Sequence, residues 1–161
     1  MPRVVRGRVV RGIRKLSYFV RVMLLASIVS NLSGLAFGLF YEGIFFDNLA
    51  HFLTWLALLA LAGEIAHLHG ARFVDSGRRA LAVGAAVGLV GGVAWEVIEI
   101  VADLLPAYIY NPPLDSVSDT FFGMLGGATG AWRTNAYLGD KAGNVSKPAA
   151  TAPQHRTPPT S

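Results

Sequence analysis

Long runs of hydrophobic residues fill the middle of the chain. They form four segments, at residues 16–40, 48–67, 80–105 and 116–136. Each has about the 20 mostly apolar residues that a helix needs to cross the hydrocarbon core of a bilayer. No Lys or Arg occurs between Val22 and Ala71, nor between Ala80 and Trp132, and each of these gaps can hold a pair of such helices. We therefore predict an all-α, polytopic membrane protein: a bundle of four transmembrane helices.

The positive charges alternate from one connection to the next. The chain has seven Lys and Arg up to Arg21, none in 41–47, three in 68–79, none in 106–115 and four from Arg133 onward. Short cytoplasmic loops carry an excess of Lys and Arg, so this alternation predicts four spans with the N-terminus and the C-terminus both in the cytoplasm. The expected parts are a basic cytoplasmic segment (1–15), a membrane domain (16–136) and a disordered cytoplasmic tail (137–161).

Composition narrows the class of protein further. The 161 residues suggest one domain, and a mean hydropathy of +0.46 with 15% charged residues indicates an integral membrane protein. The net charge of +4 belongs to the termini and one loop, so we do not expect nucleic-acid binding. The absence of cysteine excludes disulfides, thiolate metal ligands and a cysteine nucleophile.

Glycines recur at intervals of four residues in three of the segments. Such spacing lets helix backbones approach closely in a membrane, and we interpret it as a packing signal. The glycines concerned are Gly34 and Gly38, then Gly84, Gly88 and Gly92, then Gly123 and Gly127 with Gly126 and Gly130.

Three of the predicted helices each carry a pair of ionisable residues toward the same side of the membrane. Residues three or four apart share one face of a helix. At 1.5 Å per residue, Glu96 and Glu99 lie about 14 and 9 Å below the outer end of the third segment. The three pairs are Asp47 with His51, Glu96 with Glu99, and Asp115 with Asp119. We expect them to converge near the non-cytoplasmic side.

The convergence places five carboxylates beside one imidazole, with no Lys or Arg in that half of the membrane domain. Carboxylates inside a bilayer are costly unless they are paired or hydrated. A bound divalent cation would supply the missing charge, and this ligand set suits Mg²⁺, Mn²⁺, Fe²⁺ or Zn²⁺. We thus predict that Asp47, His51, Glu96, Glu99, Asp115 and Asp119 form a metal site. Two alternatives stay open: a protonatable relay, and a structural role in which the side chains cap helix ends.

Other polar residues have weaker interpretations. Ser27 and Asn31 give the first helix a polar side, which favours interhelical hydrogen bonds. Glu64 lies near the cytoplasmic end of the second helix, where we expect it to reach the interface. Trp95 either walls the predicted site or faces lipid.

The motifs resemble a known pattern. Asp47-Asn48-Leu49-Ala50-His51-Phe52, Trp95-Glu96-Val97-Ile98-Glu99 and Asp115-Ser116-Val117-Ser118-Asp119, followed by Gly123 and Gly127, resemble the YjdF-type bacterial inner-membrane proteins of unknown function. They are more distantly similar to the VanZ-like family, which is linked to teicoplanin resistance. The VanZ-like pattern has Gln at the position of Glu99 and Asn at that of Asp119. The resemblance implies a multi-pass protein of the bacterial inner membrane.

Three functions fit these features. The first is a metal-dependent hydrolase or transferase that acts on a lipid or lipid-linked phosphate, with His51 or Glu99 as general base. The second is a proton- or cation-coupled transporter, for which four helices would require a homodimer. The third is a noncatalytic membrane scaffold. The expected partner in the first case is a membrane lipid.

Overall fold

The computed structural model describes residues 15–42, 44–70, 76–103 and 113–145, and all regular structure in these ranges is helical. Three long helices and one short one precede the last: α2 (Tyr18–Phe37), α3 (Leu39–Glu42), α4 (Ile44–Leu68) and α5 (Gly77–Asp103). The last helix, α6, covers Pro113–Val145. The prediction of an all-α chain is confirmed.

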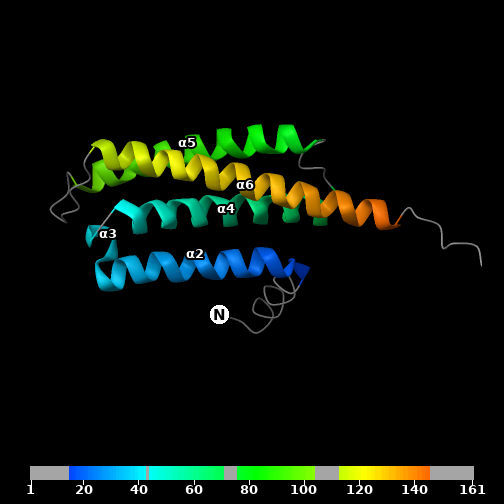
Figure 1. The fold of residues 1–161 in the computed structure, drawn as a ribbon, viewed down its shortest axis with the longest axis horizontal. Helices are drawn as coiled ribbons and strands as arrows, with labels where there is room; N and C mark the ends of the chain where they lie inside the picture. Colours follow the sequence, from blue (N-terminus) through cyan, green and yellow to red (C-terminus); the bar gives the residue numbers. More distant parts are fainter. Residues whose placement is uncertain (1–14, 43, 71–75, 104–112, 146–161) are drawn as a thin grey trace, which may run out of the picture.

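The long helices run alternately up and down, side by side (Figure 1). The backbones approach most closely between α5 and α6 and between α4 and α6, and α2 packs on α4, whereas the backbones of α4 and α5 lie further apart and meet through side chains such as Trp55, which packs on Gly91. The helices therefore lie in the spatial order α2, α4, α6, α5. The predicted fourth helix, α6, thus lies between the predicted second and third helices, α4 and α5.

Within the described ranges, three helices are long and apolar enough, by length and composition, to cross a membrane: Tyr18–Phe37, Phe45–Leu68 and Gly77–Val101. Many of their large hydrophobic side chains are exposed on the protein surface, among them Leu25, Leu35, Val90 and Ile98. Such broad apolar surfaces are stable against lipid and not against water. The helices thus indicate a membrane protein.

The first predicted segment ends earlier than expected, because Gly38 breaks it. Gly38 closes α2 with a φ of 67°, a left-handed conformation that residues with a Cβ rarely adopt. The four-residue helix α3 follows and turns the chain toward α4 (Figure 1). At its other end, α2 is capped by the Ser17 side chain, which accepts a hydrogen bond from the backbone N–H of Val20 at 3.2 Å.

Helix α6 continues beyond residue 136, where the sequence predicted the start of a tail. It extends to Val145, because residues 137–145 lack proline and include good helix formers. Residues 146–161 of the expected tail, and the basic segment 1–14, lie outside the described residues.

The predicted glycine packing is confirmed between α5 and α6. A Cβ atom added to Gly84 would collide with the backbone oxygen of Gly127, and one added to Gly88 with that of Gly123. On its other side α6 meets α4 in the same way, since a Cβ on Gly126 would collide with the Phe52 carbonyl oxygen. Backbones at such short separation bring polar side chains of neighbouring helices within reach of one another.

Candidate metal centre

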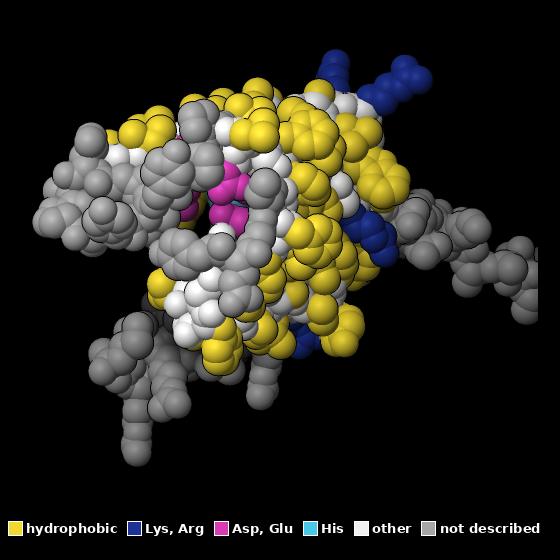
Figure 2. Space-filling view, turned by 60° about the vertical axis from the view of Figure 1, so that its left-hand side comes forward, with side chains coloured by type: hydrophobic (Ala, Val, Ile, Leu, Met, Phe, Trp, Pro, Cys, Tyr) yellow, Lys and Arg dark blue, Asp and Glu magenta, His cyan; other side chains and the backbone are white. Residues whose placement is uncertain are grey.

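The residues of the predicted metal site gather at one end of the helix row, which we call the acidic end. There α2 ends, α4 begins, α5 ends and α6 begins (Figure 1). In Figure 2, Asp and Glu side chains are visible in an opening at this end, and Lys and Arg side chains lie toward the opposite end. The Lys and Arg side chains that the structure describes come from the opposite ends of α2, α5 and α6: Lys15, Arg21, Arg78, Arg79 and Arg133.

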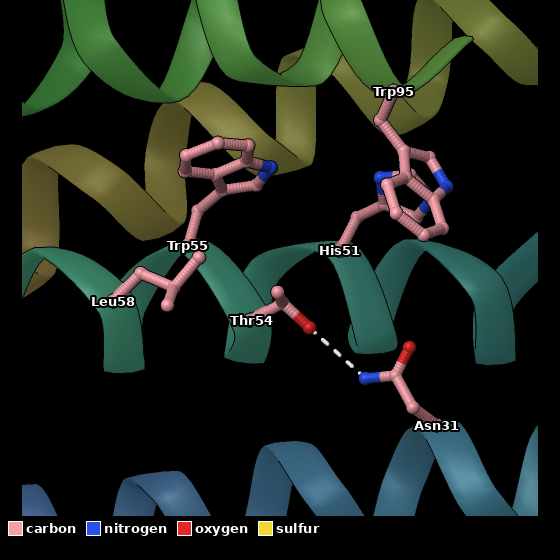
Figure 3. A pocket seen from close by; sticks show the side chains of 6 residues that line it. All are labelled: Asn31, His51, Thr54, Trp55, Leu58 and Trp95. Atoms are coloured by element: carbon pink, nitrogen blue, oxygen red, sulfur yellow. Dashed lines mark hydrogen bonds between the residues drawn. The ribbon is translucent and has the colours of Figure 1, made fainter. Parts of the chain in front are cut away.

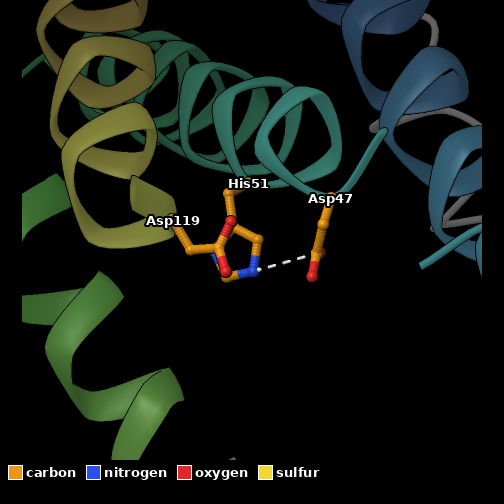
Figure 4. A group of neighbouring side chains, drawn as sticks. All are labelled: Asp47, His51 and Asp119. Carbon is orange, nitrogen blue, oxygen red and sulfur yellow. Dashed lines mark ion pairs between the residues drawn. The ribbon is translucent and has the colours of Figure 1, made fainter. Parts of the chain in front are cut away.

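Three of the six predicted ligands form a compact group. One side-chain ligand atom each of Asp47, His51 and Asp119 lies within 4.8 Å of the others. We call these residues the Asp–His–Asp group. Asp47 and His51 come from the first two turns of α4, and Asp119 comes from the second turn of α6 (Figure 4). The close approach of α4 and α6 thus brings the predicted pair Asp47 and His51 together with Asp119, which lies far away in the sequence.

His51 lies between the two carboxylates of the group (Figure 4). Its Nε2 atom is 3.5 Å from Oδ1 of Asp47, and its side chain is 8% exposed. A buried imidazole that faces two carboxylates can either share a proton with them or offer a nitrogen lone pair to a cation. The position of one ring between two acids permits either use.

Asp119 has the most unusual environment in the group. It is fully buried, and with Val20 it is one of the two largest fully buried side chains among the described residues. Neither of its carboxylate oxygens has a hydrogen-bond partner there. Burial of an unpaired ionised carboxylate costs several kcal/mol, so its position requires a compensating proton or cation.

The other three predicted ligands surround this group without joining it. The charges of Glu96, Glu99 and Asp115 interact with Asp119, so all the carboxylates of the predicted site lie near one another. Glu96 is 5% exposed. Asp115 is half-buried, and its Oδ1 atom has no hydrogen-bond partner among the described residues. Of the six predicted ligands, three therefore form a compact group that could hold a metal ion, and the other three are its neighbours.

Glu99 has a partner that the sequence left open. The Nε1–H of Trp95 donates a hydrogen bond to Oε1 of Glu99 at 2.7 Å. Trp95 therefore borders the acidic residues, which was one of the two expectations for it, and its side chain is 48% exposed.

A hydrogen bond between α4 and α6 lies directly beside the Asp–His–Asp group. The hydroxyl of Ser118 donates a hydrogen bond to Oδ1 of Asn48 at 2.7 Å. Each residue is adjacent to a group member, Asn48 to Asp47 and Ser118 to Asp119. The bond fixes the register of α6 against α4. The sequence contains no sign of it beyond the position of Asn48 next to Asp47.

The polar side of α2 also forms the expected contacts. The Ser27 hydroxyl shares a hydrogen bond with Thr54 Oγ1 at 3.0 Å, and Asn31 Nδ2 donates to the same oxygen at 3.0 Å. The expectation for Glu64 is wrong, since this residue is buried and its Oε2 accepts the backbone N–H of Ser17 at 2.7 Å. Glu64 accepts a backbone hydrogen bond at the start of α2 instead of reaching the membrane interface.

The acidic end borders two grooves on the sides of the helix row. The first, the α4 groove, has a volume of about 210 Å³ and is lined by Asn31, His51, Thr54, Trp55, Leu58 and Trp95 (Figure 3). The second lies between α5 and α6, has a volume of about 470 Å³ and includes Glu96 with mostly apolar residues such as Leu89 and Phe121. Both grooves open on surfaces that would face lipid.

Comparison with protein-family models gives no match, and neither do comparisons with curated proteins and with solved structures.

Proposed function

We propose that this protein is a multi-pass protein of the bacterial cytoplasmic membrane and that it acts as a metal-dependent hydrolase or transferase on a lipid or lipid-linked phosphate. In this proposal α6 crosses the membrane as the fourth span, both termini are cytoplasmic and the acidic end faces outward. The alternation of Lys and Arg between connections supports the orientation. The position of α6 between α4 and α5 supports its place in the membrane, because both neighbours have the length and composition of spans.

The observation that carries the proposal is the buried, unpartnered carboxylate of Asp119 within the Asp–His–Asp group. A cation bound there would compensate the charge of Asp119 and of the nearby acids together. The Lys and Arg side chains in the described ranges lie toward the other end of the helices (Figure 2) and cannot do so. Two carboxylates and an imidazole suit Mg²⁺, Mn²⁺, Fe²⁺ or Zn²⁺.

A phosphate-bearing substrate could bind at this site only together with a cation. Without a cation, five neighbouring carboxylates would repel a phosphate group. When bound, a divalent ion supplies a Lewis acid for phosphate oxygens and lowers the pKa of coordinated water. Asp47, His51 and Asp119 would hold the ion, while Glu96 and Asp115 add negative charge around it.

Glu99 is then the best-placed general base in this proposal. It lies beside the Asp–His–Asp group but outside it, so its carboxylate is not required as a ligand. Trp95 orients one of its oxygens through the 2.7 Å hydrogen bond. His51, the other candidate base from the sequence, is the nitrogen donor of the group and would be engaged by the cation.

Metal analysis of purified protein tests the proposal. We expect wild-type protein, purified in detergent without chelators, to contain a divalent metal at near-stoichiometric amount and Asp119→Asn to lose most of it. Glu64→Gln is the matched control: it changes another buried carboxylate at the opposite end of α4, and Gln can still accept the Ser17 N–H. Wild-type protein without metal, or equal loss in both variants, would contradict the proposal.

The activity is tested with the same samples. Vesicles containing phosphatidate serve as the probe, and release of inorganic phosphate is the readout. We expect metal-dependent release by wild-type protein and by Glu64→Gln, and none by Asp119→Asn. Release that persists in Asp119→Asn would place the reaction elsewhere.

A further inference from the structure

We infer that the α4 groove holds one hydrocarbon chain of a phosphate-bearing membrane lipid whose headgroup lies at the Asp–His–Asp group. This inference rests on the proposed function and names how its substrate is bound. The groove exists because α2 packs on α4 whereas α5 packs mainly on α6. This arrangement leaves one face of α4 uncovered between Asn31 of α2 and Trp95 of α5 (Figure 3).

The groove is continuous with the acidic residues where it reaches His51. His51 lines it and also belongs to the Asp–His–Asp group. Trp95 lines it and donates its hydrogen bond to Glu99. An occupant of the groove would therefore contact two side chains that are directly linked to the proposed site.

The direction of the groove matches the direction of a lipid in a bilayer. Its lining follows one face of α4 from His51 through Thr54 and Trp55 to Leu58, residues spaced as neighbours on a helix surface. Leu58 lies about 10 Å further along the helix than His51 at 1.5 Å per residue, toward the middle of α4. A headgroup at the acidic end would place its chain along this face.

The walls of the groove suit a hydrocarbon chain. Trp55, Leu58 and Trp95 supply large apolar surfaces (Figure 3). The polar atoms Asn31 Nδ2 and Thr54 Oγ1 are hydrogen-bonded to each other at 3.0 Å, so this pair requires no polar ligand. The volume of about 210 Å³ is below the roughly 300–1,000 Å³ typical of sites for drug-sized molecules, which fits a single chain and not a whole lipid.

A pair of matched substitutions tests the inference. Leu58→Trp fills the α4 groove, and Leu89→Trp fills the groove between α5 and α6. The two leucines are equally exposed, at 43% and 42%. The measurement is retention of phosphatidate by native mass spectrometry after transfer from detergent, made in a Glu99→Gln background so that the bound lipid is not hydrolysed, with metal content determined on the same samples. We expect Leu58→Trp to retain phosphatidate about tenfold less, the change that about 1.4 kcal/mol of lost binding produces, with metal content unchanged. Leu89→Trp should behave as wild type.

The outcomes separate the inference from the proposed function. Equal phosphatidate retention in both variants, or loss in Leu89→Trp alone, overturns the lipid site whatever the metal content. Absence of metal from wild-type protein overturns the proposed function. Phosphatidate retention by Leu58→Trp and Leu89→Trp then still shows whether a lipid chain occupies the α4 groove. A wild-type dimer that retains no lipid and that Leu58→Trp converts to monomers would assign the groove to a second copy of the chain and overturn the inference.

A fluorescence measurement covers the case in which Leu58→Trp does not fold. Trp55 and Trp95 line the groove, and Trp132, the third tryptophan of the chain, lies elsewhere. In a Trp132→Phe protein, phosphatidate with brominated chains should quench the remaining fluorescence saturably at low mole fraction in detergent micelles. Quenching that only follows the bulk fraction of brominated lipid, without saturation, would contradict a bound chain.

Discussion

The indole of Trp95 donates a 2.7 Å hydrogen bond to the carboxylate of Glu99, one turn further along α5. The two side chains also connect two parts of the molecule, because Trp95 lines the α4 groove and Glu99 lies among the acidic residues. A residue of the groove thereby sets the position of a residue proposed to act on a proton.

Removing this donor should lower activity without removing metal. Trp95→Phe keeps an aromatic ring in the groove but removes the hydrogen bond that Trp95 donates to Glu99. Hydrogen bonds to charged groups contribute about 1.5–3 kcal/mol, so we expect phosphate release from phosphatidate vesicles to fall about tenfold or more. Trp132→Phe is the control, and equal rates in the two variants would show that the bond does not position Glu99 for the reaction.

Replacing the proposed base should separate chemistry from metal binding. Glu99→Gln keeps the shape of the side chain and its acceptor for Trp95, but it cannot take up a proton at neutral pH. General bases contribute about 10²–10⁴-fold to rates, so phosphate release should fall by that factor while elemental analysis finds wild-type metal. Metal loss in Glu99→Gln would instead assign this carboxylate to the cation.

The glycine contacts between α5 and α6 should be critical for stability. Gly84→Ala would place a methyl group against the backbone oxygen of Gly127, and such overpacking costs about 1–3 kcal/mol. We expect a lower midpoint of thermal unfolding, measured by loss of the monodisperse peak after heating in detergent. Gly139→Ala is the control, because nothing lies within 4 Å of its added Cβ and alanine favours the helix by up to about 1 kcal/mol. An unchanged midpoint in Gly84→Ala would disprove the tight contact.

The hydrogen bonds between α2 and α4 should contribute less. Thr54→Val keeps the volume of the side chain but removes the oxygen that both Ser27 and Asn31 contact. Interhelical hydrogen bonds in membranes contribute about 0.6–1.7 kcal/mol, so the unfolding midpoint should fall by less than in Gly84→Ala. Thr129→Val serves as control, since the Thr129 hydroxyl bonds to Leu125 within its own helix. Equal effects of the two threonine variants would argue against the interhelical network.

The sequence predicted the helices well, because their apolar length and the placing of charges are local properties of the chain. It also predicted that Asp47, His51 and Asp119 would lie at one end, since the direction of each helix follows from the up-and-down order. It did not predict which ligands meet. That depends on the spatial order of the helices, which is set by glycine contacts such as those of Gly84 and Gly126 and has no signature in hydropathy.

Two predictions were wrong for different physical reasons. Glu64 was expected at the interface, but its carboxylate satisfies the backbone at the start of α2, a partner that only the packing of α2 on α4 brings near. The first segment was expected to run on to residue 40, but the backbone conformation of Gly38 ends α2. Hydrophobicity is continuous across Gly38, so the pattern of apolar residues contains no sign of the break.

The position of α6 between α4 and α5 has a consequence for how the protein is made. Synthesis proceeds from the N-terminus, so α4 and α5 are complete before α6 leaves the ribosome. Until α6 arrives, each of these two helices lacks the neighbour with which it has its most extensive packing. Of the described helices α6 is the last to be synthesised, and its Asp119 completes the Asp–His–Asp group.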